Sequence, residues 1–215
     1  MPTSLSQHRH RLTIQVKTLN AGFTRHLGVK HKLRQLDKVA LREGLISPLW
    51  QYWGQFVRSV LIDSAKGAIQ DNGALTTCPY SIHTEEEIAF VCMQLAQKNP
   101  INLIKPIKGP HLEPTWGDVD KAILIASNLG VSNDAQILSG LAIPLSIRDL
   151  QTCRNATAHL GKATFSDLKS AKVRYSDTKL LHPTDAMMWS DPSTLGYLWD
   201  TWVDQILMAS EYVCK

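Results

Sequence analysis

Apolar side chains recur at helical spacing along most of this chain, and this pattern limits the fold more than any other feature of the sequence. Residues three and four apart share one face of a helix, so such spacing marks the side that a helix buries. The clearest stripe occupies the last segment and consists of Leu195, Leu198, Trp199, Trp202, Ile206, Ala209 and Val213. The chain has no internal repeat and no convincing alternation typical of a β-strand. The sequence therefore predicts an all-α fold.

Capping and turn residues divide this pattern into separate helices. A serine, threonine or aspartate before an apolar stripe favours a helix start, and glycine or proline favours an end. These signals predict helices over 5–19 and 29–41, a break at 20–22, and further helices that open at Ser47, Thr84, Thr115, Ser132, Ser146 and Asp191. Thr84 with Glu87 forms a capping box, and Asp118 and Asp149 accompany Thr115 and Ser146 at their helix starts. The helix that opens at Thr115 is expected to end near Gly130, and the one that opens at Ser146 at Gly161. We expect a basic helical N-terminal extension, residues 1–44, followed by a helical domain, residues 45–215.

The positive charge of the chain is concentrated near its start. Residues 1–42 contain nine lysines and arginines but one acidic residue, Asp37. Such a basic block suits a phosphate backbone, which attracts cations without reading sequence. The candidate RNA-binding residues are Arg25, Lys30, Lys32 and Arg34 of this block, together with Arg148. The alternatives are a solvated helix face and an organellar transit peptide, because no acidic residue precedes Asp37.

Several other protein classes lack support in the sequence. The chain contains no phosphate loop of the form G-x-x-x-x-G-K-[ST] and no G-x-S-x-G nucleophile elbow. Its four cysteines have no zinc-ligand spacing, so we expect reduced thiols, no metal site and no cofactor. No run of about 18 apolar residues is present, and no apolar stretch follows the basic start. We expect a cytoplasmic protein without a membrane segment.

The segment 146–161, SIRDLQTCRNATAHLG, carries a cation on the apolar side of its predicted helix. At about 100° per residue, one flank is formed by Ile147, Leu150, Cys153, Thr157 and Leu160. Arg154 falls within this flank. Burying an unpaired guanidinium is costly, and arginine cannot lose its proton to avoid that cost. We therefore expect Arg154 to reach solvent, to pair with an acid, or to point into a polar cavity formed with another surface, including a second copy of the chain.

Asn155 and His159 lie four residues apart and share the polar face of this helix. Histidine changes charge near neutral pH and is the usual side chain for proton transfer in catalysis. RNA supplies its own nucleophile, the 2′-hydroxyl, so its cleavage needs a proton acceptor, a proton donor and a cation for the phosphorane charge. One histidine and one arginine per protomer can supply these groups without a metal ion. The alternative is a structural pair between Arg154 and an acid, with His159 at the surface.

The segment Arg154–His159, RNATAH, resembles the Arg-polar-x-x-x-His motif of HEPN domains, and the helical surroundings are similar too. HEPN domains are all-α proteins of toxin–antitoxin, abortive-infection and other defence systems. The resemblance implies a HEPN-like antiparallel helical bundle that forms a homodimer, with two motifs facing one RNA-cleaving cleft. It also implies that His159 is the acid/base, Arg154 the phosphate or transition-state ligand, and Asn155 the polar partner that orients them.

The chain departs from this family in two places. Some HEPN toxins have a tyrosine two residues after the histidine, where a partner nucleotidyltransferase attaches AMP, but this chain has Gly161. The basic N-terminal segment has no obvious counterpart in the family. We expect a metal-independent endoribonuclease, a toxin or antiviral effector, whose partners are RNA and an antitoxin or defence-system protein. The alternative is a non-catalytic helical module that binds RNA or a protein, because some HEPN domains serve only as scaffolds or dimerisation units.

Overall fold

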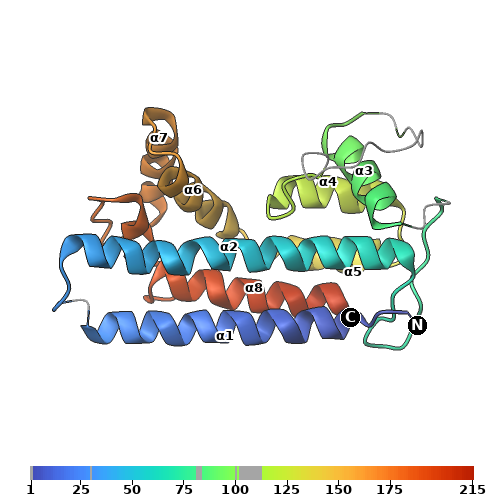
Figure 1. The fold of residues 1–215 in the computed structure, drawn as a ribbon, viewed down its shortest axis with the longest axis horizontal. Coiled ribbons are helices and arrows are strands. Elements are labelled where there is room, and N and C mark those ends of the chain that lie inside the picture. The colour runs from blue at the N-terminus through green and yellow to red at the C-terminus, as the bar shows by residue number, and fades with distance from the viewer. Residues whose placement is uncertain (1, 30, 81–83, 100, 102–112) are drawn as a thin grey trace. The chain divides into compact units, whose positions relative to one another are not determined.

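The computed structural model describes residues 2–29, 31–80, 84–99, 101 and 113–215, and these residues are predominantly helical (Figure 1). The helices are α1 (Leu5–Val29), α2 (Gln35–Lys66), α3 (Glu85–Ala96), α4 (Val119–Leu129), α5 (Asp134–Leu141), α6 (Ile147–Ala158), α7 (Lys162–Ala171), the short 3-10 helices η2 (Lys172–Arg174) and η3 (Pro183–Met188), and α8 (Leu198–Cys214). The described residues form isolated bridges but no β-strand, which confirms the predicted all-α class. Within the same residues, no helix is both long and apolar enough to cross a membrane.

The chain divides into two compact units. Unit 1 contains Met1–Leu12, Trp53–Ile143 and Met208–Lys215, and unit 2 contains Thr13–Tyr52 and Pro144–Leu207. Helices α1, α2 and α8 each contribute residues to both units, whereas α3, α4 and α5 belong to unit 1, and α6 and α7 to unit 2. The predicted boundary after residue 44 falls inside α2, and several side chains of the segment before it are buried.

Helix α1 continues through Asn20–Gly22, so the predicted break there is wrong. The reason is packing within unit 2. A Cβ atom on Gly22 would lie only 3.1 Å from the Leu45 side chain of α2, so the small residue allows the two helices to approach each other. The indole Nε1 of Trp199 donates a hydrogen bond of 2.9 Å to Asn20 Oδ1. Asn20 and Gly22, which suggested a turn, therefore both take part in tertiary contacts within a continuous helix.

Helix α2 continues through Ser47 and Pro48, so the predicted helix start at Ser47 is also wrong. A proline inside a helix removes one backbone hydrogen bond and costs roughly 3 kcal/mol. The residues on either side of Pro48 form one buried stripe that consists of Leu45, Ile46, Leu49 and Trp50. Burial contributes roughly 1.5–3 kcal/mol for each of the three aliphatic side chains in this stripe, and together they outweigh the cost of the proline.

In unit 1 local capping signals predict one helix start and one helix end correctly. The hydroxyl of Thr84 accepts a hydrogen bond from the Glu87 N–H, and the Glu87 carboxylate accepts one from the Thr84 N–H, which confirms the predicted capping box of α3. Helix α4 begins after Asp118 and not after the predicted Thr115, because the Asp118 side chain caps its first turn. It ends as predicted at Gly130, whose φ of 70° lies in the left-handed region.

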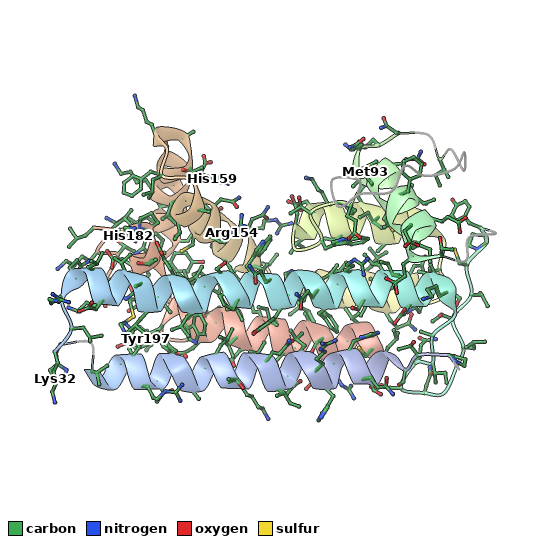
Figure 2. The ribbon with its side chains drawn as sticks, viewed as in Figure 1. Lys32, Met93, Arg154, His159, His182 and Tyr197 are labelled. Carbon is green, nitrogen blue, oxygen red and sulfur yellow. The ribbon has the colours of Figure 1, made fainter. Side chains whose placement is uncertain are left out.

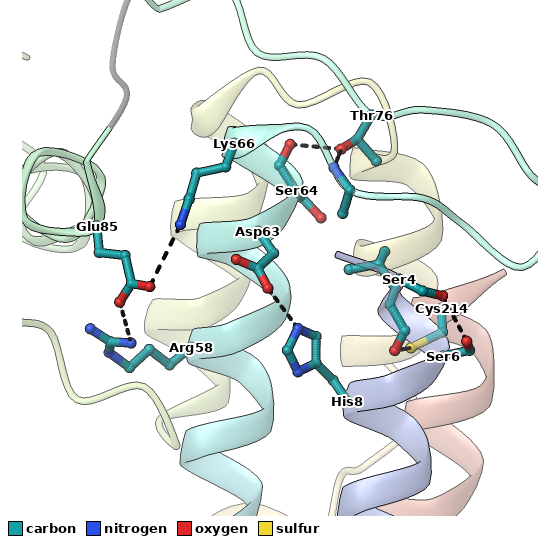
Figure 3. Close-up of polar contacts among 12 residues, drawn as sticks. Ser4, Ser6, His8, Arg58, Asp63, Ser64, Lys66, Thr76, Glu85 and Cys214 are labelled. Carbon is teal, nitrogen blue, oxygen red and sulfur yellow. Dashed lines mark hydrogen bonds and ion pairs between the residues drawn. The ribbon is translucent and has the colours of Figure 1, made fainter. Parts of the chain in front are cut away.

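Part of the basic N-terminal segment forms ion pairs inside unit 1. His8 Nε2 lies 2.7 Å from Asp63 Oδ2 of α2 (Figure 3). Arg9 Nη1 lies 2.6 Å from Asp71 Oδ2, in the segment that follows α2. These two basic side chains therefore join α1 to the rest of unit 1 and are not part of a solvated cationic face.

Helix α8 begins at Leu198 and not at the predicted Asp191. Asp191 instead stabilises a turn, because its carboxylate accepts hydrogen bonds from the backbone N–H and the hydroxyl of Ser193 (2.9 and 2.7 Å). Leu195, which the sequence placed on the buried stripe, lies in this turn with a φ of 57° and is 86% exposed. The remainder of the predicted stripe is buried.

Replacing Gly140 of α5 by alanine is expected to destabilise unit 1. A Cβ atom at this position would lie 2.3 Å from a side-chain carbon of Val213 and 2.8 Å from the carbonyl oxygen of Ala209. Both belong to α8, whose backbone would have to move, and such overpacking typically costs about 1–3 kcal/mol. Chemical denaturation followed by circular dichroism would measure the lower midpoint.

The matched control for this change is Gly28→Ala in α1. No atom lies within 4 Å of a Cβ built on Gly28, so alanine meets no obstacle there. Alanine in a helix is favoured over glycine by roughly 0.5–1 kcal/mol, and this variant should be as stable as the parent protein or slightly more stable. Equal destabilisation by the two substitutions would contradict the close packing at Gly140.

Candidate functional site

Helix α6 carries two of the three predicted catalytic residues, Arg154 and Asn155, and the third, His159, follows its last residue. The helix buries one face within unit 2, where it packs against α7 and η3. The buried apolar residues of α6 follow one another at intervals of three, so they lie on the same side of the helix. They are Ile147, Leu150, Cys153 and Ala156. Leu160 was predicted to extend this face. It is 75% exposed, because α6 ends at Ala158 and the chain turns before it.

Asp149 is a buried acidic residue that no local sequence pattern identified. Its carboxylate accepts hydrogen bonds from the guanidinium of Arg174 and from the hydroxyl of Tyr175, both in or beside η2. Burial raises the pKa of Tyr175, and the hydrogen bond to Asp149 raises it further, so the phenol remains a proton donor to the carboxylate. This network fixes the first turn of α6 against the segment that follows α7.

Ser146 and Asp149, which were expected to open α6 together, form no capping hydrogen bond, and Ser146 contacts α8 instead. Both the backbone N–H and the hydroxyl of Ser146 bond to Gln205 Oε1, at 3.0 and 2.8 Å. Ser146 still precedes the first residue of α6, but its side chain makes no capping hydrogen bond. The start of α6 is thus held from two directions, by Gln205 and by the Asp149 network.

Arg154 lies half-buried on the side of α6 that faces α2 (Figure 2). It lines a cavity of about 190 Å³ together with Glu43, Ile46 and Ser47 of α2 and Thr157 and Ala158 of α6. Its Nη1 donates a hydrogen bond of 3.2 Å to the neighbouring Asn155 Oδ1. No ion pair between Arg154 and a carboxylate is present among the described residues. Of the three placements that the sequence allowed, the cavity is the nearest to the structure, and Arg154 shares it with the acidic residue Glu43.

Cys153, next to Arg154 in the chain, is not a competing nucleophile. Its side chain is fully buried and its Sγ donates a hydrogen bond of 3.3 Å to the carbonyl oxygen of Pro183 in η3. Burial raises the pKa of this thiol, so the reactive thiolate is not formed near neutral pH.

His159 ends α6 and is exposed. Its backbone N–H still donates to Asn155 O (2.9 Å), but its φ of −130° and ψ of 82° have left the helical region. Its carbonyl oxygen accepts hydrogen bonds from the Gly161 N–H (2.7 Å) and from the Thr164 hydroxyl (2.6 Å). Gly161, predicted to end α6, is therefore the residue that opens α7. The backbone of His159 is held on both sides, while its imidazole faces solvent beside α7 (Figure 2).

One chain brings Arg154 and Asn155 together but does not join His159 to them. Residues five apart on a helix are rotated by about 140°, so Arg154 and a helical residue at position 159 would point to different sides. No hydrogen bond links the His159 imidazole to either residue within the described part of the chain. A complete set of cation and imidazole around one substrate would need contributions from more than one copy, or a substrate that spans both sides of α6.

The candidate RNA-binding residues are exposed where the structure describes them. Arg25 lies on α1, Lys32 between α1 and α2, and Arg148 on α6, all in unit 2. Arg34 is exposed too, and its Nε lies 3.2 Å from Asp37 Oδ2 in a surface pair. Lys30 lies outside the described residues.

Arg42 belongs to the basic segment but is buried and cannot serve a solvated cationic face. Its Nη1 donates to a carboxylate oxygen of Asp185 in η3, and its Nε donates to His26 Nε2 (3.1 Å) of α1. One signal could have revealed this placement, because Arg42 precedes Leu45 and Leu49 by three and seven residues and so lies on the apolar stripe of α2. Arg42 and Arg154 therefore interrupt apolar stripes in the same way, but Arg42 has an acidic partner.

The geometry around α6 can bind an anion and exchange protons. A half-buried guanidinium at the wall of a cavity attracts a phosphate oxygen, and a neighbouring amide fixes its orientation. A solvent-facing imidazole at the helix end can accept or release a proton. Comparison of the chain with protein-family models, with curated proteins and with solved structures found no match.

Proposed function

We propose that this chain is a metal-independent endoribonuclease with Arg154, Asn155 and His159 as its catalytic residues. One observation carries the proposal: Arg154 is half-buried at the wall of a cavity and, among the described residues, its guanidinium bonds to an amide instead of a carboxylate. A cation removed from water in this way is stabilised by an anionic ligand. The phosphodiester of RNA is such a ligand.

The proposed reaction needs no external nucleophile. The 2′-hydroxyl gives its proton to a neutral His159 imidazole while its oxygen attacks the adjacent phosphorus. The bond from phosphorus to O5′ breaks, and O5′ takes a proton from a protonated imidazole. The products are a 2′,3′-cyclic phosphate and a 5′-hydroxyl end. Arg154 neutralises the charge that develops on the non-bridging oxygens, and Asn155 holds the guanidinium in place.

A homodimer with a HEPN-like arrangement of helices would place two such sets in one cleft. The second imidazole would then supply the proton that the leaving oxygen needs. Unit 2 exposes several large apolar side chains, which is consistent with a surface for self-association. They include Leu145, Leu160, Val173 and Leu181. Leu160 directly follows His159, so a contact at this surface would bring the imidazole close to the second copy.

Exposed cations of unit 2 provide the RNA-binding surface in this proposal. Arg25, Lys32, Arg34 and Arg148 are in the same unit as Arg154. Solvated arginines and lysines bind the phosphate backbone without reading its sequence, so binding should weaken as salt is raised. A role as toxin or antiviral effector, held in check by an antitoxin or defence-system protein, follows from the family resemblance of the RNATAH segment.

A second candidate function is a non-catalytic module that binds RNA or a protein. The exposed position of His159, without a hydrogen bond to Arg154 or Asn155 in the described residues, favours this alternative. A surface that only binds RNA has no need of a proton-transfer group close to the guanidinium.

Cleavage of labelled RNA in the presence of EDTA separates these two functions. We expect the purified chain to cut single-stranded RNA with the chelator present and to leave fragments that end in 2′,3′-cyclic phosphate, identified by mass spectrometry. The matched substrate carries 2′-O-methyl groups throughout and should be bound but not cut, because the internal nucleophile is blocked. Binding of both substrates without cleavage of either would support the non-catalytic module and contradict the proposal.

A further inference from the structure

A second cavity lies between the end of α1 and the start of α2, within unit 2. Its volume is about 460 Å³, in the range of roughly 300–1,000 Å³ that is typical of small-molecule sites. It shares none of its lining residues with the Arg154 cavity. Neither the RNATAH segment nor the exposed cations of α6 contribute to it.

Two glycines line this cavity, Gly22 of α1 and Gly44 of α2. At Gly22 the two helices are close, because a Cβ atom there would lie 3.1 Å from the Leu45 side chain. At Gly44 a Cβ atom would meet nothing within 4 Å. Gly44 lines the cavity, so the missing side chain leaves space that a larger residue would fill.

The lining combines an apolar wall with one accessible cation. Val29 and Leu41 line it and are 43% and 47% exposed, which is unfavourable for large apolar residues unless something covers them. Arg25 lines it as well, is exposed, and forms no ion pair in the described part of the chain. No acidic side chain is among the described lining residues.

The inner part of the cavity is held by a buried hydrogen-bond network. His26 lines the cavity and is buried, and its Nε2 accepts a hydrogen bond from Arg42 Nε (3.1 Å). The Arg42 guanidinium is in turn bonded to Asp185. Since this network joins α1, α2 and η3, the cavity wall is preorganised and does not depend on a ligand for its shape.

We propose that this cavity binds a small amphipathic carboxylate. The apolar body of the ligand packs against Val29, Leu41 and Leu45, and its carboxylate pairs with Arg25. A phosphate backbone alone would use the cation but leave the apolar wall exposed, whereas a neutral apolar molecule would leave the cation without a partner. This inference does not rest on the proposed ribonuclease function, because the cavity shares only Arg25 with the proposed RNA-binding surface and its measurement involves no RNA.

Titration of the full chain with decanoate, followed by isothermal calorimetry and ligand-observed NMR, tests the proposal. We expect saturable binding of decanoate, weaker binding of decanol, which has the same chain without the charge, and no binding of acetate, which has the charge without the chain. Arg25→Gln should weaken decanoate binding by at least about tenfold, since it removes a charged hydrogen bond. Gly44→Leu should abolish it by filling the space.

Two matched variants serve as controls. Gly28→Leu also adds a side chain to a helical glycine with nothing within 4 Å, but Gly28 does not line the cavity, so decanoate binding should persist. Arg11→Gln removes an exposed cation of α1 that does not line the cavity, so this variant should bind decanoate like the parent protein. Circular dichroism establishes that each variant is folded. The proposal is overturned if decanoate does not bind, if a folded Gly44→Leu variant binds it like the parent, or if decanol binds equally well and Arg25→Gln changes nothing.

Discussion

Replacing His159 by alanine is expected to lower the rate of RNA cleavage by about 10²–10⁴-fold, the usual contribution of a general acid or base. The imidazole faces solvent at the end of α6, and no hydrogen bond to the protein depends on it among the described residues. The backbone of His159 makes the local contacts, and alanine preserves them. The variant should therefore fold normally and bind RNA as tightly as the parent, so that the loss appears in the rate of cleavage and not in affinity.

A gel-based cleavage assay under single-turnover conditions, with RNA affinity measured separately by filter binding, checks this result. His10→Ala is the matched control, because His10 is an exposed histidine of α1 outside the RNATAH segment, and its cleavage rate should equal that of the parent. If the folded His159→Ala variant cut RNA at the parental rate, histidine would have no part in the chemistry. The ribonuclease would then need a different proton acceptor, or the activity would belong to a contaminant.

Replacing Asp185 by alanine is expected to lower the free energy of unfolding by about 3–5 kcal/mol, the range found when one partner of a buried ion pair is removed. Its carboxylate accepts hydrogen bonds from the Arg42 guanidinium and from the backbone N–H groups of Leu181 (2.8 Å) and His182 (2.9 Å). Arg42 is only 8% exposed, so its charge would remain buried without a counter-ion. Urea denaturation followed by tryptophan fluorescence would measure the change.

Two further variants separate the ion pair from the other contacts of Asp185. Asp37→Ala removes the partner of Arg34 in an exposed pair and should cost no more than about 1 kcal/mol. Asp185→Asn keeps an oxygen for the two backbone N–H groups but removes the charge, and combining it with Arg42→Met removes the isolated cation. We expect the double variant to be more stable than Asp185→Asn alone. If Asp185→Ala were no more harmful than Asp37→Ala, Arg42 would not depend on this carboxylate.

Arg42 and Arg154 are two charged residues that the sequence places on apolar stripes. Spacing identifies both as exceptions, because an i, i+3, i+4 pattern is a property of neighbours within two helical turns. It does not identify what each cation meets. The carboxylate that pairs with Arg42 lies 143 residues away in the chain, in η3, whereas the cavity at Arg154 is completed by residues of α2.

Helix boundaries show the same division. The Thr84–Glu87 capping box and the glycine that ends α4 were predictable, because both involve hydrogen bonds and dihedral angles within a few residues. The breaks expected near Gly22 and at Pro48 did not occur. A glycine or proline inside these helices destabilises them by at most a few kcal/mol. Burial of the surrounding apolar side chains against other helices stabilises the fold by more than that.

By itself, the amino-acid sequence determined the helical class, most of the buried stripe of α8, and the position of Arg154 and Asn155 on one helix, with His159 directly after its last residue. Periodicity and capping determine these features, since both act over one or two turns of chain. Only the tertiary structure decided which cations are buried in ion pairs, which remain exposed, and where glycines leave space between helices. Those outcomes depend on contacts between segments that are distant in sequence, and no local pattern records the partner.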